Sequence, residues 1–149
     1  MQRLALTILL FSISASAQNP AAKPASNASN DSTATSAIST TVRNYIEAYY
    51  TGDALRMKQT MHPHYLKHMI HGDIPMRERT AAQMEQEVRS NHGPSSQPQA
   101  EKTEQISVLD IAGDIASAKL VTPHWVDYLT LSKLDGQWKI LSVVQRMED

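Results

Sequence analysis

The sequence predicts an α+β domain in which three helices are followed by a curved antiparallel sheet. Two observations support this fold class. Apolar residues recur at helical spacing after residue 36, whereas residues 104–145 contain four segments typical of strands. These segments are joined in pairs by two hairpin signals, Ala112-Gly113-Asp114 and Asp135-Gly136. Helices grouped before strands indicate an α+β order rather than repeated βαβ units.

The first residues resemble a targeting segment. Arg3 precedes an apolar run from Leu4 to Ile13, and the small residues Ala15-Ser16-Ala17 follow it. This pattern is typical of a secretory signal peptide covering residues 1–17, and the run is too short for a stable membrane span. We therefore expect a periplasmic or secreted protein.

A polar segment separates the leader from the domain. Residues 18–35 are rich in Ala, Ser, Asn, Thr and Pro and carry no large apolar side chain. Such a composition cannot bury enough surface to fold alone, so we expect a disordered linker followed by one domain over residues 36–149.

Composition excludes several classes of function. The chain has 149 residues, no cysteine and a formal charge of −1, so disulfides are excluded and nothing electrostatic favours nucleic acid as a partner. Dinucleotide, phosphate-loop, nucleophile-elbow and His-Glu-x-x-His motifs are absent. We expect no cofactor.

The first predicted helix presents one apolar face. Its residues recur three or four positions apart, and Tyr50 is expected to point away from them; the face comprises Ile38, Val42, Tyr45, Ile46 and Tyr49. Gly52 can end this helix, and Asp53 can cap a short second one. Pro63 interrupts that second helix.

The next segment is ambiguous. "HYLKHMI", residues 64–70, fits either a strand or a helical turn. Thr80 is a cap candidate for a third helix in which Met84 and Val88 share one side. Residues 91–99 carry the glycine, prolines and polar residues of a loop.

The strands after this loop carry apolar side chains on both faces. In the penultimate strand Trp125, Asp127, Leu129 and Leu131 share one face, and Val126, Tyr128 and Thr130 share the other. In the last strand Trp138, Ile140, Ser142 and Val144 are expected on one face. A sheet covered by helices on one side only normally has a more polar outer face, so we expect a homodimer through the opposite sheet face.

Three stretches carry a resemblance to a known family. "VRNYIEAYYTGDALRMKQTMHP", "VLDIAGDIASAKL" and "WVDYLTLSKLDGQWKILSV" resemble the putative lumazine-binding branch of the nuclear transport factor 2-like superfamily. The resemblance covers residues 38–144. It implies a cone-shaped fold whose open end takes a small apolar molecule, and a fold shared with ketosteroid isomerase, scytalone dehydratase and polyketide cyclases. Fold alone does not carry an activity.

Four of the six histidines fall in "MHPHYLKHMIHG": His62, His64, His68 and His71. No regular conformation brings all four together, and Pro63 interrupts them, so we predict no metal site. His62 occupies the family's His-Pro position, which packing at a helix end would explain.

Asp127 is unusual on an apolar strand. If it points into a dry cone, burial would raise its proton affinity and suit it to acid–base catalysis, as a buried carboxylate does in isomerases of the superfamily. Alternatively, Lys119 or Lys139 on neighbouring strands could pair with it, or it could contact a dimer partner.

Aromatic residues complete the candidate site. Tyr45 and Tyr49 on the first helix and Trp125 in the sheet suit a ring-shaped ligand, although aromatic residues also fill cores. Three functions stay open. The first is an exported domain that binds a small apolar or aromatic ligand without an established reaction. The second is a cofactor-free isomerase, dehydratase or cyclase with Asp127 as acid or base, assisted by His62 or Tyr45. The third is a structural dimerisation module.

Overall fold

The computed structural model describes residues 25–90 and 99–147, with side chains from residue 31 onward. Its helices are α1 (Ala25–Thr51), α2 (Ala54–Thr60) and α3 (Ala81–Arg89), with a short 3-10 helix, η2 (Gln99–Glu101). The expected signal peptide and most of the expected loop after α3 lie outside the described residues. The three predicted helices are all present.

The sheet has six strands in the order β2-β1-β6-β5-β4-β3. They are β1 (Met61–His71), β2 (Ile74–Thr80), β3 (Gln105–Ala112), β4 (Ile115–Val121), β5 (Trp125–Leu134) and β6 (Gln137–Met147). The four C-terminal strands were predicted, and the ambiguous segment is the strand β1. The four predicted strands pair in antiparallel fashion as expected. The strand β1, which the sequence left ambiguous, pairs with β6 in parallel.

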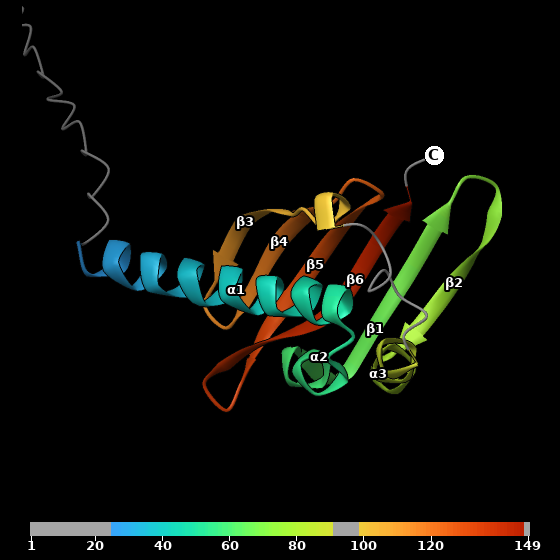
Figure 1. The fold of residues 1–149 in the computed structure, drawn as a ribbon. Coiled ribbons are helices and arrows are strands. Elements are labelled where there is room, and N and C mark those ends of the chain that lie inside the picture. The colour runs from blue at the N-terminus through green and yellow to red at the C-terminus, as the bar shows by residue number, and fades with distance from the viewer. Residues whose placement is uncertain (1–24, 91–98, 148–149) are drawn as a thin grey trace, which may run out of the picture.

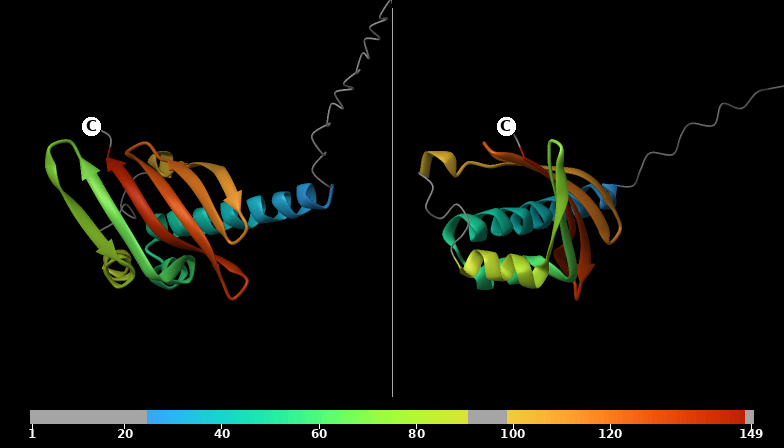
Figure 2. Two further views of the ribbon diagram at one scale, coloured as in Figure 1. Left: turned by 180° about the vertical axis from the view of Figure 1, so that it is seen from behind. Right: turned by 90° about the vertical axis from the view of Figure 1, so that its right-hand side faces the viewer.

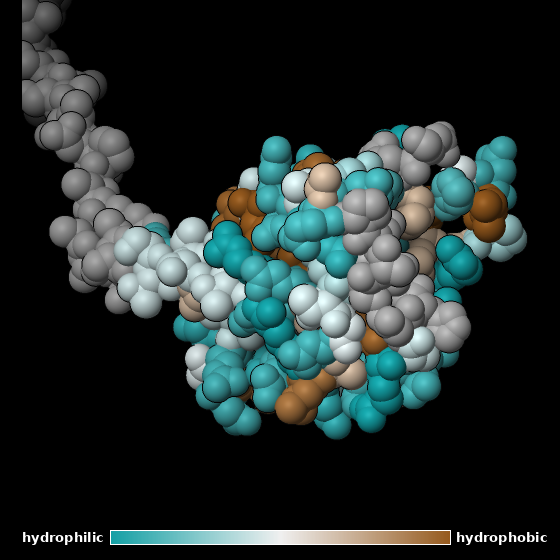
Figure 3. Space-filling view, viewed as in Figure 1, coloured by the Kyte–Doolittle hydropathy of each residue, from teal (hydrophilic) through white to brown (hydrophobic). Residues whose placement is uncertain are grey.

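All three helices lie on one side of this curved sheet (Figures 1 and 2). The opposite side is left without a covering helix, and Tyr128 and Val144 are exposed there as cross-strand neighbours. The helix-covered side has a largely polar surface with small separate apolar patches (Figure 3). None of the described helices combines the length and apolarity needed to cross a membrane.

The first helix begins earlier than expected. Residues 25–35, assigned to a disordered linker from their composition, form the N-terminal part of α1. Of the residues whose side chains are described, Ala34 is partly buried against the core, and Ile38 is the first that is fully enclosed. The other residues from 31 to 37 are exposed, which explains why composition gave no sign of a helix there.

Tyr50 also departs from the prediction. It was expected to point away from the apolar face, yet it is buried and its hydroxyl donates to the backbone oxygen of Thr103 at 3.0 Å. Thr103 lies in the segment just before β3, which covers this second side of α1. The helix thus buries more than the one face that its periodicity indicates.

Local signals define the element ends as predicted. Gly52 has a positive φ after α1, and the Asp53 carboxylate accepts from the Arg56 N–H at 2.9 Å. Thr80 and Gln83 form a capping box at α3. Asp135 and Gly136 both have positive φ, as a type I′ hairpin turn requires.

A bulge in β6 changes which residues face the helices. Leu131 of β5 pairs with Ile140, whereas Thr130 pairs with Ser142, so Leu141 is an extra residue. Beyond it the alternation is reversed. Val144, expected beside Trp138 and Ile140, is exposed, and Gln145 is buried instead.

Candidate functional site

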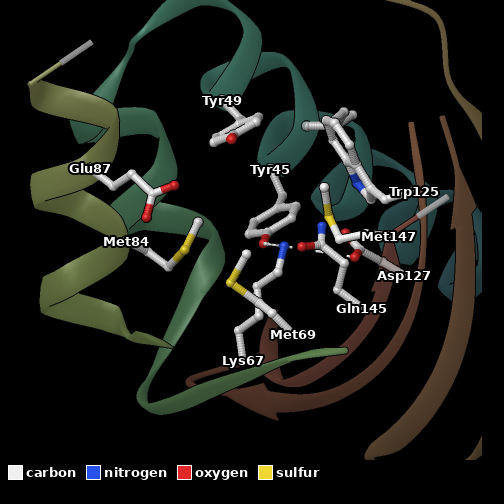
Figure 4. A pocket seen from close by; sticks show the side chains of 11 residues that line it. Tyr45, Tyr49, Lys67, Met69, Met84, Glu87, Trp125, Asp127, Gln145 and Met147 are labelled. Carbon is white, nitrogen blue, oxygen red and sulfur yellow. Dashed lines mark hydrogen bonds and ion pairs between the residues drawn. The ribbon is translucent and has the colours of Figure 1, made fainter. Parts of the chain in front are cut away.

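A small cavity lies between α1, α3 and the strands β1, β5 and β6. Its volume is about 60 Å³, and the 11 lining side chains are Tyr45, Ile46, Tyr49, Lys67, Met69, Met84, Glu87, Trp125, Asp127, Gln145 and Met147 (Figure 4). Aromatic rings, methionines and one buried pair of opposite charges therefore meet in one place.

The parallel pairing of β1 with β6 brings Lys67 into this cavity. Lys67 pairs with Val143, and Met69 pairs with Gln145. Because side chains alternate along a strand, Tyr65, Lys67 and Met69 all point to the helix side. The segment that was ambiguous in the sequence thus supplies one wall of the site.

Lys67 and Asp127 form a buried ion pair. The ammonium nitrogen lies 3.7 Å from Oδ1 of Asp127, and the two side chains are 7% and 0% exposed. The lysine comes from β1 and the aspartate from β5, with β6 between them in the sheet. A buried charge normally requires such a partner, since desolvation of a lone ion is very unfavourable.

Burial shifts the proton affinity of both members of this pair. It raises the pKa of Asp127, and the neighbouring Lys67 ammonium, together with Gln145 and the Trp125 indole, opposes that rise. Burial lowers the pKa of Lys67, and Asp127 opposes that fall. Each group is therefore easier to neutralise than it would be in water.

The carboxylate of Asp127 has unused hydrogen-bonding capacity. Among the described residues, neither of its oxygens accepts a hydrogen bond of ordinary geometry, although both are buried. The polar groups of Gln145 and Trp125 lie near the carboxylate and lower its pKa. Buried acceptors are rarely left in this state, so these oxygens mark a place where a ligand group can bind.

Two tyrosines extend the polar floor of the cavity. The Tyr45 and Tyr65 hydroxyl groups lie 3.0 Å apart, and the Lys67 ammonium donates to the Tyr45 oxygen at 3.4 Å. Burial raises the pKa of both hydroxyls well above the usual value. Both tyrosines therefore stay neutral at physiological pH and can act as hydrogen-bond donors.

Trp125 and Tyr49 form the aromatic wall. Their rings meet edge to face with centroids 5.8 Å apart. The Thr122 hydroxyl holds the start of β5 by accepting from the Trp125 N–H at 3.1 Å. Burial and the nearby carboxylates of Glu87 and Asp127 raise the pKa of Tyr49 to about 12.

The rest of the cavity wall consists of three flexible methionine side chains and the carboxylate of Glu87. Met69, Met84 and Met147 point toward the same space (Figure 4). Glu87 at the rim accepts from Arg79 at 3.1 Å, so its charge is compensated. Methionine side chains are unbranched and can rearrange around a guest molecule.

The structure brings together four of the five predicted site residues. Tyr45, Tyr49, Trp125 and Asp127 all line the cavity, whereas His62 does not. His62 lies at the start of β1, where its Nδ1 accepts from the His64 N–H at 3.0 Å. The geometry therefore gives His62 no role beside Asp127.

The partner of Asp127 also differs from those considered. Lys119 lies over the Tyr128 ring on the outer face, 5.5 Å from its centroid, and Lys139 donates to the backbone oxygen of Gln59. Lys67 takes their place. Sequence reasoning missed it because the β1–β6 pairing could not be inferred, and it missed Gln145 because the bulge was not visible.

Metal binding finds no support in the part of the chain that the structure describes. No three His, Cys, Asp or Glu side chains gather there closely enough to hold an ion. His68 contacts Glu78 across the β1–β2 hairpin, with Nε2 and Oε1 3.2 Å apart. His68 points to the opposite side of β1 from Lys67 and Met69.

Comparison with known families gives a match over most of the chain. The model of the family described as "Putative lumazine-binding" matches residues 33–145. This range contains every residue of the cavity except Met147. A comparison with curated proteins found no match.

Solved structures share the fold at low sequence identity. A nuclear transport factor 2-like protein of unknown function from Silicibacter pomeroyi is 18% identical with a TM-score of 0.64, covering 79% of this chain and 98% of its own. A similar protein from Shewanella baltica is 16% identical with a TM-score of 0.63, covering 86% and 99%. A ketosteroid isomerase-like protein from Erwinia carotovora is 11% identical with a TM-score of 0.54, covering 77% and 96%.

Proposed function

This chain belongs to the Putative lumazine-binding family and shares the fold of nuclear transport factor 2-like proteins. From that premise we propose that it binds a small flat molecule in the cavity between α1, α3 and the sheet. The observation that carries the proposal is the cavity itself. Its aromatic and methionine walls end at one buried ion pair, Lys67 and Asp127. Sites for small molecules commonly combine an apolar lining with a few convergent polar groups.

The size of the cavity limits what can enter. A volume of about 60 Å³ is well below the roughly 300–1,000 Å³ of pockets that hold drug-sized ligands. It is also below the roughly 150 Å³ of an engineered cavity that holds benzene. Binding therefore requires the wall to open, and the side chains of Met69, Met84 and Met147 are the ones suited to move.

Native mass spectrometry of protein purified without unfolding tests the proposal. We expect a bound small molecule, and we expect Met69→Trp to lose it because the indole would fill the cavity. Ile70→Trp is the matched control, since Ile70 is 42% exposed and the next residue along the same strand. The proposal fails if no variant carries a molecule and no flat aromatic probe binds the unmodified protein.

A second candidate is a cofactor-free isomerase, dehydratase or cyclase in which Asp127 acts as acid or base. The raised pKa of Asp127 and the lack of a hydrogen bond to its oxygens among the described residues favour this chemistry. One structural neighbour is described as ketosteroid isomerase-like. Nuclear magnetic resonance of the bound molecule in D₂O separates the two. Exchange of a carbon-bound proton that is lost in Asp127→Asn would support the enzyme, and its absence supports simple binding.

We also propose that two chains pair through the uncovered sheet face. Tyr128 and Val144 are neighbours across β5 and β6, and they are 52% and 44% exposed near the middle of that face. Apolar groups in such a position favour burial against a second copy. Sedimentation over a range of concentrations should give a dimer, and Tyr128→Glu should give a monomer. A monomer at every concentration would refute the pairing.

Finally, we propose that the domain acts after export to the periplasm or outside the cell. The support is the signal-like pattern of residues 1–17. The mass of the mature protein recovered from cells should correspond to cleavage after Ala17. Recovery of the uncleaved chain from the cytoplasm would contradict this.

A further inference from the structure

We propose that the Lys67–Asp127 pair recognises the edge of a neutral flat heterocycle at which a ring N–H stands beside a C=O group, as in a cyclic amide or imide. This inference rests on the proposed binding function and names the chemical class of its ligand. Lumazine, a pteridine dione, carries such edges, and so does the single ring of uracil.

Asp127 supplies the acceptor. Its two carboxylate oxygens are fully buried, face the cavity and accept no hydrogen bond of ordinary geometry from the described residues. An ionised carboxylate has only acceptor sites. A ligand that binds there with a gain in free energy must therefore bring a donor, such as an N–H group.

Lys67 supplies the donor. Its ammonium has three N–H bonds, and among the described residues it makes one long hydrogen bond, to Tyr45 at 3.4 Å. The nitrogen is 3.7 Å from Asp127, beyond a normal hydrogen bond. A carbonyl oxygen of a ligand can therefore approach the ammonium without displacing a short bond.

The distance between Lys67 and Asp127 allows one edge of a ligand ring to contact both side chains. Lys67 Nζ and Asp127 Oδ1 lie side by side 3.7 Å apart. A ring N–H and its adjacent C=O are neighbouring atoms that make roughly parallel hydrogen bonds. One ring edge can therefore meet both members of the pair at once, with the N–H toward Asp127 and the C=O toward Lys67.

Charge favours a neutral ligand. The pair has no net charge, and Glu87 at the rim is compensated by Arg79. An ionic ligand would bring a buried charge without a partner, which is strongly unfavourable. A flat neutral ring would instead contact the Tyr49 and Trp125 rings, which line the same cavity.

Two isomers of dimethyllumazine test the inference by fluorescence titration of the unmodified protein. The 6,7-dimethyl isomer keeps both ring N–H groups, whereas the 1,3-dimethyl isomer has the same formula and no ring N–H. At a pH where both are neutral, we expect the 6,7-isomer to bind about tenfold more tightly or better, because only it can satisfy Asp127. Calorimetry with 5,6-dimethyluracil and 1,3-dimethyluracil repeats the comparison on a single ring.

A double variant tests whether Lys67 and Asp127 cause the preference for the 6,7-dimethyl isomer. Lys67→Met/Asp127→Leu removes both charges together, so neither is left buried alone. We expect this variant to bind the two isomers about equally. A preference that persists undiminished in the folded double variant would place the recognition elsewhere and overturn the inference.

The outcomes separate this inference from the proposed function. Equal binding of the isomers for both ring sizes, or tighter binding of the N-methylated ones, overturns the inference and leaves small-molecule binding intact. If naphthalene, which has no polar edge, binds and none of the four isomers binds, the inference is likewise overturned and small-molecule binding stays intact. If none of these rings binds, both proposals fail.

Discussion

The Lys67 side chain reaches past β6 to place its ammonium 3.7 Å from Oδ1 of Asp127 on β5. Val143 of β6 pairs with Lys67, and Gln145 pairs with Asp127, so the ion pair spans the strand between them. A single buried contact therefore joins three strands at the point where the cavity lies. Under the proposed function, the same two residues contribute to both stability and ligand binding.

A double-mutant cycle should reveal this coupling. Lys67→Met and Asp127→Asn should each lower the free energy of unfolding by about 3–5 kcal/mol, because each leaves a buried charge or acceptor without its partner. Together they should cost clearly less than the sum of the two. Urea unfolding followed by circular dichroism measures the cycle.

Lys119→Met is the matched control for that cycle. Lys119 lies over Tyr128 on the uncovered sheet face, and it is paired with no carboxylate there among the described residues. Its replacement should change the stability of the monomer by no more than about 0.5 kcal/mol. Additive effects at Lys67 and Asp127 would mean that the two side chains do not interact.

The pH dependence of stability should carry the signature of the buried pair. Burial raises the pKa of Asp127 in the folded protein. Its contribution to stability is therefore complete below the pKa of the unfolded chain, about 3.9, and is lost as pH rises through the folded pKa. Because burial lowers the pKa of Lys67, its contribution is lost as pH falls through the folded pKa and returns toward about pH 10.4.

Relative to the double variant Lys67→Met/Asp127→Asn, the unmodified protein should therefore be least stable near neutral pH. Its relative stability should improve toward both acid and alkaline pH. Unfolding free energies of the two proteins measured at a series of pH values give this difference directly. A difference that is greatest near neutral pH would show that the ionised pair stabilises the fold.

The two tyrosine hydroxyls should differ in importance. Tyr45 contacts both Lys67 and Tyr65, whereas among the described residues the Tyr65 hydroxyl forms its hydrogen bond with Tyr45. Tyr65→Phe should cost about 1 kcal/mol, and Tyr45→Phe about 2–3 kcal/mol, because it leaves two buried groups without a partner. Thermal unfolding of both variants tests the order. Equal costs would mean that the contact between Lys67 and Tyr45 contributes nothing.

The bulge at Leu141 can be tested because the chain has no cysteine. Val144→Cys should react readily with a soluble maleimide in the monomer, whereas Gln145→Cys should be protected, since Gln145 is 4% exposed. If side chains alternated without a bulge from Trp138 onward, Val144 would be protected and Gln145 would be exposed. Faster labelling at position 145 than at position 144 would show that the bulge is absent and that Gln145 lies outside the cavity.

Local sequence signals were sufficient for most of the fold. Helix caps at Asp53 and Thr80 and the turn at Asp135-Gly136 depend on neighbouring residues alone, and all three were predicted correctly. The face of β5 that carries Trp125 and Asp127 followed from simple alternation. These features need no knowledge of which strands meet.

The missing parts of the site depend on contacts between distant segments. Lys67 lies in a histidine-rich stretch and has no local signal of a functional role. Only the parallel pairing of β1 with β6 places it beside Asp127. Gln145 and Met147 face the cavity because Leu141 is an extra residue, and a bulge leaves no clear mark in a strand of this composition. The start of α1 was missed because the polar composition of residues 25–35 predicted a disordered linker.

The most direct test of the account is a crystal structure of the protein purified without unfolding and soaked with 6,7-dimethyllumazine. We predict density for a flat ring between the Tyr49 and Trp125 side chains, with its polar edge on Lys67 and Asp127 and with the methionine side chains displaced. A cavity that stays closed around an unchanged Lys67–Asp127 pair, in a protein that also carries no molecule of its own, would contradict it.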